Sequence, residues 1–265
     1  MKTRISIILP TYNEAGNIIL LIEQIVEELT NEDYEIIVVD DNSPDGTSNL
    51  VQQAILKFPN LRLLTRTSDK GLVPSIREGI EKSRGSICIW LDADLSMSPI
   101  LIKTIINEID LGADLVVGSR YISGGGIKGM EFNNDETSLY KIWVNLYESE
   151  DSFVSVMISK WGNKIIKFIL NSPLHDHSSG YFGGRKKIFY FIQIEGYFVD
   201  YCVSLSYKSY MKGFNVVEVP MFVLPRKSGK SKTSNSLFSI LLIALQCLTT
   251  AFILRFTVKN ERGNL

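Results

Sequence analysis

The 265-residue sequence is poor in the residues that build disulfide frameworks and zinc sites, and it has no excess of one charge. Its three cysteines, Cys88, Cys202 and Cys247, are far apart, odd in number and without zinc-ligand spacing, a pattern typical of a reducing cytosol. Its 28 lysines and arginines nearly balance its 29 aspartates and glutamates. Since a nucleic-acid-binding domain would normally be basic, this balance argues against a nucleic-acid partner.

The sequence also lacks a secretory signal, internal repeats and a linker that would mark a second domain. Its first apolar run covers only residues 5–9, and the polar segment 11–17 follows almost at once. We therefore expect the functional face of the protein to be cytoplasmic. The two histidines, His175 and His177, have one residue between them and no third ligand beside them, which favours a polar turn over a metal site.

Apolar runs rich in β-branched residues alternate with amphipathic helical patterns. The first predicted strands span residues 5–10, 34–40, 61–66, 86–92 and 113–121, and a helical pattern follows each of the first four. Later helices are predicted at 153–170 and 198–213, and later strands at 179–184 and 215–224. Because the early strands are apolar on both faces, we expect an α/β fold with a mainly parallel sheet and helices on both sides.

Three segments fall outside this alternation. The glycine-rich segment 123–130 lacks the strand–helix setting of a phosphate cradle and predicts a flexible loop, and the acidic segment 131–152 predicts a solvated insertion. Residues 233–254 carry no charge, and 14 of the 18 residues at 237–254 are apolar. The basic residues that flank them are Arg226, Lys227, Lys230 and Lys232 before and Arg255 and Lys259 after.

This apolar segment is at the short end for a bilayer span, and its basic flanks suit phospholipid headgroups. We expect a catalytic domain at 1–232 and a membrane-associated or transmembrane helix at 233–258. A buried core helix is the alternative.

Charged side chains follow the predicted strands at the points where they end. The residues at these ends include Asp40, Asp41, Arg66, Asp92, Asp94 and Arg120. Because ligands of such sheets bind beyond the carboxyl ends of the strands, we expect these groups to converge on one rim. An Asp-x-Asp pair at a strand end suits a hard divalent cation such as Mg²⁺ or Mn²⁺, whose open positions phosphate oxygens fill.

Two other interpretations of this aspartate pair are open. Asp94 can be the N-cap of the helix predicted at Pro99, which is compatible with metal binding. Phosphatases of the haloacid-dehalogenase kind also place Asp-x-Asp after a strand, with the first aspartate as nucleophile. There the motif normally opens the domain and is followed by threonine or valine, whereas here it follows the fourth strand and precedes Leu95 and Ser96.

Seven motifs occur together in one order. They are ILPTYNE at 8–14, VVDDNSPDGT at 38–47, DKGL at 69–72, DADLSMSP at 92–99, GSRYISGGGIKG at 118–129, HDHSSGYFGGRK at 175–186 and VEVPMFVLPRKSGKSK at 217–232. Together they closely resemble the family-2 glycosyltransferases of GT-A fold, in particular the dolichyl-phosphate mannose synthase-like branch. The resemblance covers residues 3–130 and the last two motifs, and it implies a Rossmann-like GT-A fold with a mixed, mainly parallel sheet.

The resemblance implies roles for the matching residues. Those implied to bind the donor nucleotide are Pro10, Tyr12, Glu14, Asp40, Asp41 and Lys70. Asp92 and Asp94 would hold Mg²⁺ or Mn²⁺ and the diphosphate of a GDP- or UDP-sugar, and Arg120, Arg226 and Lys232 would lie on the phosphate side. The implied reaction is the inverting transfer of one sugar, mannose or glucose, to a polyprenyl or dolichyl phosphate at the cytoplasmic face of a membrane.

Three positions depart from the family pattern. A glutamine that often follows the Asp-x-Asp is Ser96 here, so we expect water to complete the metal coordination. The family segment Asp-x-Thr-Ser-Gly-Phe-Arg has Phe182 in place of its arginine, and Arg185 is a candidate replacement. An arginine of the acceptor helix is replaced by Ser155, four residues before Ser159. The last two departures bear on the identity of the acceptor.

The acceptor decides whether a catalytic base is needed. A lipid monophosphate has a second pKa of about 6, so at neutral pH it is a dianion that needs only cations to hold it, supplied by Arg120, Arg226 and Lys232. A glycan or lipid hydroxyl would need a carboxylate base, for which Asp200 is the first candidate and Asp176 the second, unless either is structural. A catalytically silent nucleotide-sugar-binding protein is a further alternative, against which the intact Asp-x-Asp argues.

Overall fold

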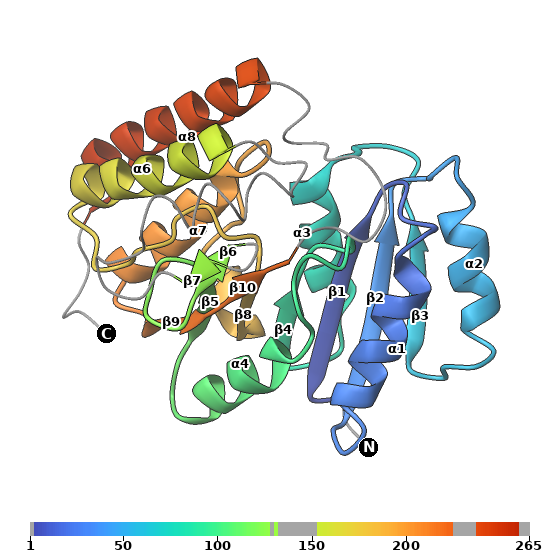
Figure 1. Cartoon of the computed structure of the whole chain (residues 1–265). Helices are drawn as coiled ribbons and strands as arrows, with labels where there is room; N and C mark the ends of the chain where they lie inside the picture. Colours follow the sequence, from blue (N-terminus) through green and yellow to red (C-terminus); the bar gives the residue numbers. More distant parts are fainter. Residues whose placement is uncertain (1–2, 128–129, 132–152, 225–236, 260–265) are drawn as a thin grey trace.

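The structure is a computed structural model that describes residues 3–127, 130–131, 153–224 and 237–259 (Figure 1). Residues 132–152 of the predicted acidic insertion lie outside the described residues, as do Arg226 and Lys232.

The first half of the chain alternates strands and helices as the sequence predicts. The strands are β1 (Ile5–Thr11), β2 (Tyr34–Asp40), β3 (Leu61–Thr65), β4 (Ile87–Trp90) and β5 (Leu115–Ser119). The helices between them are α1 (Ile18–Glu28), α2 (Thr47–Ala54), α3 (Leu72–Lys82) and α4 (Leu101–Asp110). The second half contains α6 (Phe153–Leu170), β8 (Phe182–Arg185), the 3₁₀ helix η1 (Lys186–Tyr190), α7 (Asp200–Met211), β9 (Val216–Pro220) and α8 (Leu237–Thr257).

These strands form one mixed sheet of seven strands in the order β3-β2-β1-β4-β8-β5-β9. Strand β8 runs antiparallel to both of its neighbours, and the other pairs are parallel. Buried residues of α1, α2 and α4 pack on one face of the sheet, and those of α3 and α7 pack on the other. The carboxyl ends of β1, β2, β4 and β5 therefore meet at one edge, where the sequence predicts the functional rim.

Strand β8 fits between β4 and β5 because glycines let a helix approach it closely. A Cβ atom at Gly183 would lie 2.2 Å from Cγ2 of Ile105 on α4, a distance that no real side chain tolerates. A larger residue at position 183 would therefore force α4 away from the sheet.

A second, small sheet lies beside the rim. It has the strand order β10-β6-β7 and joins β10 (Phe222–Val223), β6 (Gly126–Ile127) and β7 (Met130–Glu131). The prediction of a flexible loop at 123–130 is therefore wrong for β6, which pairs in parallel with β10.

Helices α6 and α8 form a further layer over α7 and lie side by side along the outer edge of the molecule (Figure 1). The buried residues that join them are Ile166, Leu170, Val203, Tyr207, Cys247, Ala251 and Leu254. Within the described residues, Phe238–Thr257 is the one helical stretch long and apolar enough to cross a membrane, with a mean hydropathy of 1.9. Only 17% of its apolar window is buried, so α8 is not the core helix of the alternative interpretation.

Candidate active site

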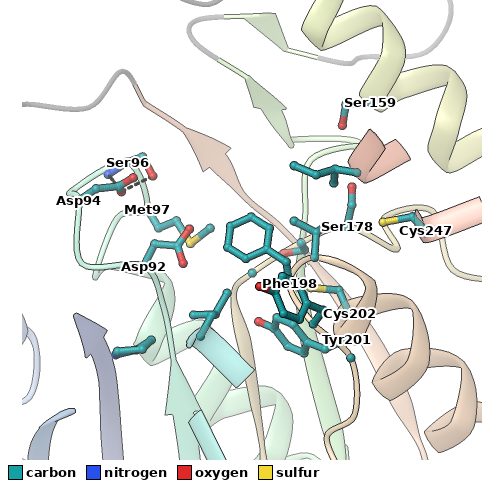
Figure 2. Close-up of a pocket in the computed structure, with 18 of the residues that line it drawn as sticks. Asp92, Asp94, Ser96, Met97, Ser159, Ser178, Phe198, Tyr201, Cys202 and Cys247 are labelled. Atoms are coloured by element: carbon teal, nitrogen blue, oxygen red, sulfur yellow. Dashed lines mark hydrogen bonds between the residues drawn. The ribbon is translucent and has the colours of Figure 1, made fainter. Parts of the chain in front are cut away.

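One cavity of about 840 Å³ follows the rim of the sheet and continues to α8 (Figure 2). The predicted site residues that line it are Pro10, Tyr12, Glu14, Asp41, Lys70, Asp92, Asp94 and Arg120. At its other end the cavity is lined by Ile240, Ile243, Ala244 and Cys247 of α8. A polar region and an apolar region thus share one continuous space.

The carboxylate of Asp41 is held at one end of the cavity by three donors. Its Oδ1 accepts hydrogen bonds from Nη1 of Arg66 at 2.8 Å and from Oγ of Ser75 at 3.0 Å, and its Oδ2 accepts the Gly71 N–H at 2.6 Å. Arg66 is buried and also donates from Nε to Glu78 at 2.8 Å. Sequence reasoning placed Arg66 at the rim but gave it no role; its role here is to fix Asp41 and the segment that carries Gly71.

Asp40 does not lie on the cavity wall, which corrects the expectation that both members of the acidic pair contact the donor. Its carboxylate is fully buried and accepts hydrogen bonds from the Ser43 N–H at 2.9 Å, from Ser48 Oγ at 2.6 Å and from Thr11 Oγ1 at 3.0 Å. Alternate residues of a strand end point to opposite sides, so only one aspartate of the pair can face the cavity. Asp40 fixes the loop after β2.

The other residues predicted to bind the donor nucleotide also line the cavity. Tyr12 is 43% exposed, and Lys70 is exposed beside Gly71, so both present their side chains to a ligand. Oε2 of Glu14 accepts a hydrogen bond from Nδ2 of Asn17 at 2.9 Å, which fixes that carboxylate at the start of α1. Pro10 completes this part of the wall.

Asp92 and Asp94 follow β4 and both line the cavity. Oδ1 of Asp94 accepts hydrogen bonds from Ser96 N at 2.9 Å and Ser96 Oγ at 2.6 Å (Figure 2). Between them Leu95 has a φ of 63°, a left-handed conformation that costs about 1–3 kcal/mol for a residue other than glycine. Beside Asp92, a Cβ atom at Gly180 would lie 3.6 Å from both carboxylate oxygens, so the glycine leaves space next to them.

This donor set fits a hard divalent cation. Within the described residues no three His, Cys, Asp or Glu side chains cluster as metal ligands, so Asp92 and Asp94 would share the cation with oxygens from other sources. Mg²⁺ is typically held in this way, by one or two carboxylates together with substrate phosphates and water. Ser96 holds Asp94 by hydrogen bonds, which is a role in the outer shell of such a site.

The alternative of Asp94 as a helix N-cap is wrong. Helix α4 begins at Leu101, Ile100 holds the N-cap position, and no side chain caps the helix.

Arg120 is held rigidly in the middle of the cavity. Its Nε donates to Oδ2 of Asp176 at 2.7 Å, and its Nη2 donates to Oδ1 of Asp176 at 2.7 Å and to Oγ of Ser178 at 2.7 Å. Its Nη1 forms no hydrogen bond with any described residue and is left for a ligand. Although burial lowers the pKa of Arg120, the Asp176 carboxylate more than offsets this, and the pKa is raised above its ordinary value.

The runner-up general base, Asp176, is therefore structural. Burial alone would raise the pKa of this carboxyl, but the Arg120 guanidinium and hydrogen bonds from Arg120 and Ser178 lower it below its ordinary value. A carboxylate that is fully ion-paired and buried is a poor proton acceptor.

Asn163 of α6, which sequence reasoning missed, connects the segment around Ser178 to that helix. Its Nδ2 donates to Oγ of Ser178 at 2.8 Å, and its Oδ1 accepts the His177 N–H at 2.7 Å. Four residues earlier, Ser159 lies 2.7 Å from the Tyr121 hydroxyl. The sequence does contain a signal for Asn163. It lies one helical turn after Ser159, so both residues are expected on the same face of the helix.

The two histidines have different surroundings. His175 donates its N–H to Glu218 and places Nδ1 2.9 Å from Oε2 of that residue, as in a polar turn. His177 is fully buried, and burial lowers its pKa to about 4. The polar-turn prediction is therefore wrong for His177, which is a core residue.

Asp200 does not line the cavity and is not placed to act as a base there. Its Oδ1 accepts the N–H groups of Tyr197 at 3.0 Å and Phe198 at 2.8 Å, and its side chain is buried at the start of α7. A carboxylate that satisfies backbone donors at a helix start has a structural role.

Arg185 does not replace the missing arginine. Because β8 is antiparallel to β4, Arg185 pairs with Ile87 at the start of β4, whereas Phe182 pairs with Trp90 near the rim. The Arg185 guanidinium instead donates to the main-chain oxygens of Ile109 and Ala113.

Comparison with known proteins agrees with this geometry. Residues 6–192 match the family model described as glycosyl transferase family 2. The chain is 31% identical over 242 residues to the polyprenol monophosphomannose synthase of Mycolicibacterium smegmatis, covering 88% of this chain and 82% of that protein. It is also 31% identical over 229 residues to the dolichol-phosphate mannosyltransferase of Pyrococcus furiosus, covering 86% of this chain and 59% of that protein.

Among solved structures, the glucosyl-3-phosphoglycerate synthase of Mycobacterium tuberculosis, crystallised with Mn²⁺, UDP and phosphoglyceric acid, superposes with a TM-score of 0.64. At 14% identity, with 95% of this chain and 78% of that chain covered, this likeness concerns the fold and confirms the expected GT-A architecture. The rim presents Asp92 and Asp94 to the cavity. Because the family model matches residues 6–192 and the two curated relatives are each 31% identical to this chain, the chain belongs to glycosyl transferase family 2.

Proposed function

We propose that the protein transfers one sugar, mannose or glucose, with inversion, from a GDP- or UDP-sugar to a polyprenyl phosphate. The observation that carries the proposal is the continuous cavity, which runs from Asp41, Asp92 and Asp94 past Arg120 to the apolar residues of α8. A nucleotide diphosphate matches its polar end, and a phosphate on an apolar chain matches its other end. The curated relatives carry names of polyprenol- and dolichol-phosphate mannose enzymes.

The cation at Asp92 and Asp94 is proposed to be Mg²⁺ or Mn²⁺. When bound, such an ion stabilises the negative charge that grows on a departing diphosphate. The solved structure of similar fold contains Mn²⁺, and another structure of the same enzyme contains Mg²⁺. Asp94 has its orientation fixed by Ser96, and Asp92 faces the space that Gly180 leaves open.

A phosphate acceptor agrees with the state of the two aspartates that were candidate bases. Asp176 is ion-paired with Arg120, and Asp200 is bonded to the main chain, so neither is available to remove a proton from a hydroxyl. A lipid phosphate already carries about two negative charges at neutral pH and attacks without a base. Arg120 supplies charge for it through Nη1, while Nε and Nη2 are held by Asp176 and Ser178.

We propose that the protein acts at the cytoplasmic face of a membrane and that α8 lies in the interface. Helix α8 packs along α6 and α7 and leaves apolar side chains exposed, among them Phe238, Leu245 and Phe256 at 70%, 60% and 75%. Helix α6 exposes Trp161 and Phe168 at 55% and 86%. Because α8 also walls the cavity, a lipid acceptor can place its phosphate at Arg120 while its chain stays in the bilayer.

The direct test is product formation by the full chain in vesicles that contain polyprenyl phosphate. GDP- and UDP-linked mannose and glucose are offered with Mg²⁺ or Mn²⁺, and lipid-linked sugar is measured. The matched control replaces polyprenyl phosphate with polyprenol of the same length. Transfer to the phosphate alone supports the proposal; transfer to polyprenol, or only hydrolysis of the donor, would replace it with a hydroxyl acceptor or a hydrolase.

A further inference from the structure

The loop at residues 195–199 brings two aromatic side chains to the cavity just before α7. Tyr197 and Phe198 both line the cavity, with Tyr197 84% exposed and Phe198 partly buried. Figure 2 shows the ring of Phe198 between Asp92 and Met97 on one side and Ser178 on the other. Phe198 therefore lies between the residues that would hold the diphosphate and those that hold Arg120.

The position of Phe198 is fixed by its main chain. Oδ1 of Asp200 accepts the Tyr197 N–H at 3.0 Å and the Phe198 N–H at 2.8 Å. Gly196 has a φ of 141°, and a Cβ atom there would lie 2.7 Å from the Tyr201 nitrogen, so no other residue fits without a shift. The loop is thus closed tightly onto the first turn of α7.

The same turn of α7 is tied to the strand that precedes the two metal-binding candidates. Nε1 of Trp90, the last residue of β4, donates to the Tyr201 hydroxyl at 3.1 Å. The rings of Trp90 and Phe182 stack with centroids 5.4 Å apart, and the Phe182 and Tyr201 centroids are 6.0 Å apart. Loop 195–199 and the segment with Asp92 and Asp94 therefore share one rigid aromatic support.

We propose that Phe198 is the wall on which the transferred sugar packs, and that it selects the sugar, with Asp200 as its positioning residue. This inference rests on the proposed glycosyl transfer. A pyranose has an apolar C–H face, and pockets bind such faces with aromatic side chains. The anomeric carbon also gains positive charge in an oxocarbenium-like transition state, and an aromatic face attracts a nearby cation.

The test compares Phe198→Ala and Phe198→Leu with the wild type, using two donors that share a nucleotide and differ in mannose against glucose. These sugars are epimers at one carbon, so the ratio of their kcat/KM values measures how strongly the enzyme discriminates between them. We expect Phe198→Ala to lower kcat/KM for the better donor about tenfold and to bring the ratio toward one. Phe198→Leu keeps apolar volume without a ring, so its kcat/KM and its epimer ratio should lie between those of the wild type and of Phe198→Ala. In both variants the Kd of the free nucleoside diphosphate with Mn²⁺ should stay at the wild-type value.

Asp200 supplies the control that separates positioning from base catalysis. Asp200→Asn keeps a side-chain oxygen for both N–H groups, so it should keep the wild-type epimer ratio and the shape of the pH profile. Asp200→Ala loses that acceptor and should shift the ratio as Phe198→Ala does. Loss of activity in Asp200→Asn equal to that in Asp200→Ala would overturn the positioning role.

The remaining outcomes are also decisive. An unchanged epimer ratio in Phe198→Ala, with an active wild type, overturns the inference and leaves the proposed function intact. A weakened Kd for the nucleoside diphosphate in the Phe198 variants places the ring in the nucleotide site and overturns it as well. A wild type that transfers neither sugar to polyprenyl phosphate overturns the proposed function together with the inference.

Discussion

Arg120 and Asp176 form a bidentate ion pair across 56 residues of sequence, with Nε–Oδ2 and Nη2–Oδ1 distances of 2.7 Å each. The Asp176 side chain is 0% exposed and that of Arg120 15%. The pair joins the end of β5 to the segment before β8 and leaves one edge of the guanidinium for a ligand. In the proposed reaction, this rigidity would make Arg120 a preorganised site for a phosphate group.

Asp176→Asn should lower the free energy of unfolding at pH 7 by about 3 kcal/mol, because it leaves a largely buried guanidinium without its anion. The pKa of Asp176 is lowered in the folded state. The stabilisation that its carboxylate provides is therefore fully present above the unfolded pKa of about 3.9 and is lost as pH falls through the folded pKa. Chemical denaturation between pH 3 and pH 8 measures it. An equal difference between variant and wild type at both ends of this range would contradict the ion pair.

Asp94→Asn should abolish transfer while leaving the fold intact, because an amide does not replace the charge of a carboxylate on a divalent cation. The expected loss is roughly 3 kcal/mol or more of transition-state stabilisation. Ser96→Ala is the matched control, because it removes the 2.6 Å hydrogen bond to Asp94 but no charge. It should lower transition-state stabilisation by only about 1 kcal/mol. Wild-type rates in Asp94→Asn, or full activity in excess chelator, would rule out the metal role.

Arg226→Ala and Lys232→Ala should weaken use of the acceptor more than use of the donor. The two residues belong to the motif after β9 and lie outside the described residues, so the expectation rests on their charge and their place in the sequence just before α8. Steady-state kinetics should show a raised KM for the polyprenyl phosphate. A rise in the donor KM alone would assign both residues to the diphosphate site.

Exposed leucines of α8 should carry the membrane contact. Leu241 and Leu245 are 50% and 60% exposed, and replacing each with glutamate should reduce binding to anionic vesicles about tenfold per side chain. Leu111→Glu is the matched control, since Leu111 is 81% exposed at the end of α4 and away from α8. Vesicle sedimentation compares them, and equal losses in all three variants would contradict a specific docking helix.

His177 should stay neutral to about pH 4, because burial lowers its pKa to about 4 from an ordinary value of 6.5. The unfolded chain then binds the proton first, so stability should fall by up to about 3 kcal/mol as pH drops from 6.5 to 4. A proton NMR titration of the imidazole resonances, with His175→Gln to assign them, gives the midpoint. A midpoint near 6.5 for His177 would contradict its burial.

The sequence by itself determined the order of strands and helices and the place of the rim that lines the cavity. The repeats of apolar residues are local, so they predict β1 to β5 and the helices between them within a few residues. Asp92 and Asp94 follow a strand directly, and parallel strands bring their carboxyl ends to one edge, so the convergence of Asp41, Asp92, Asp94 and Arg120 on one cavity needed no further information.

Only the tertiary structure decided which charged groups face a ligand. Asp40 and Asp41 are adjacent in sequence, yet one is bonded within its own loop and the other faces the cavity. Asp176 is engaged by an arginine 56 residues away, and the antiparallel direction of β8 carries Arg185 to the wrong edge. Strand direction and pairs between distant residues are set by packing between elements, and a local pattern of residues carries no record of them.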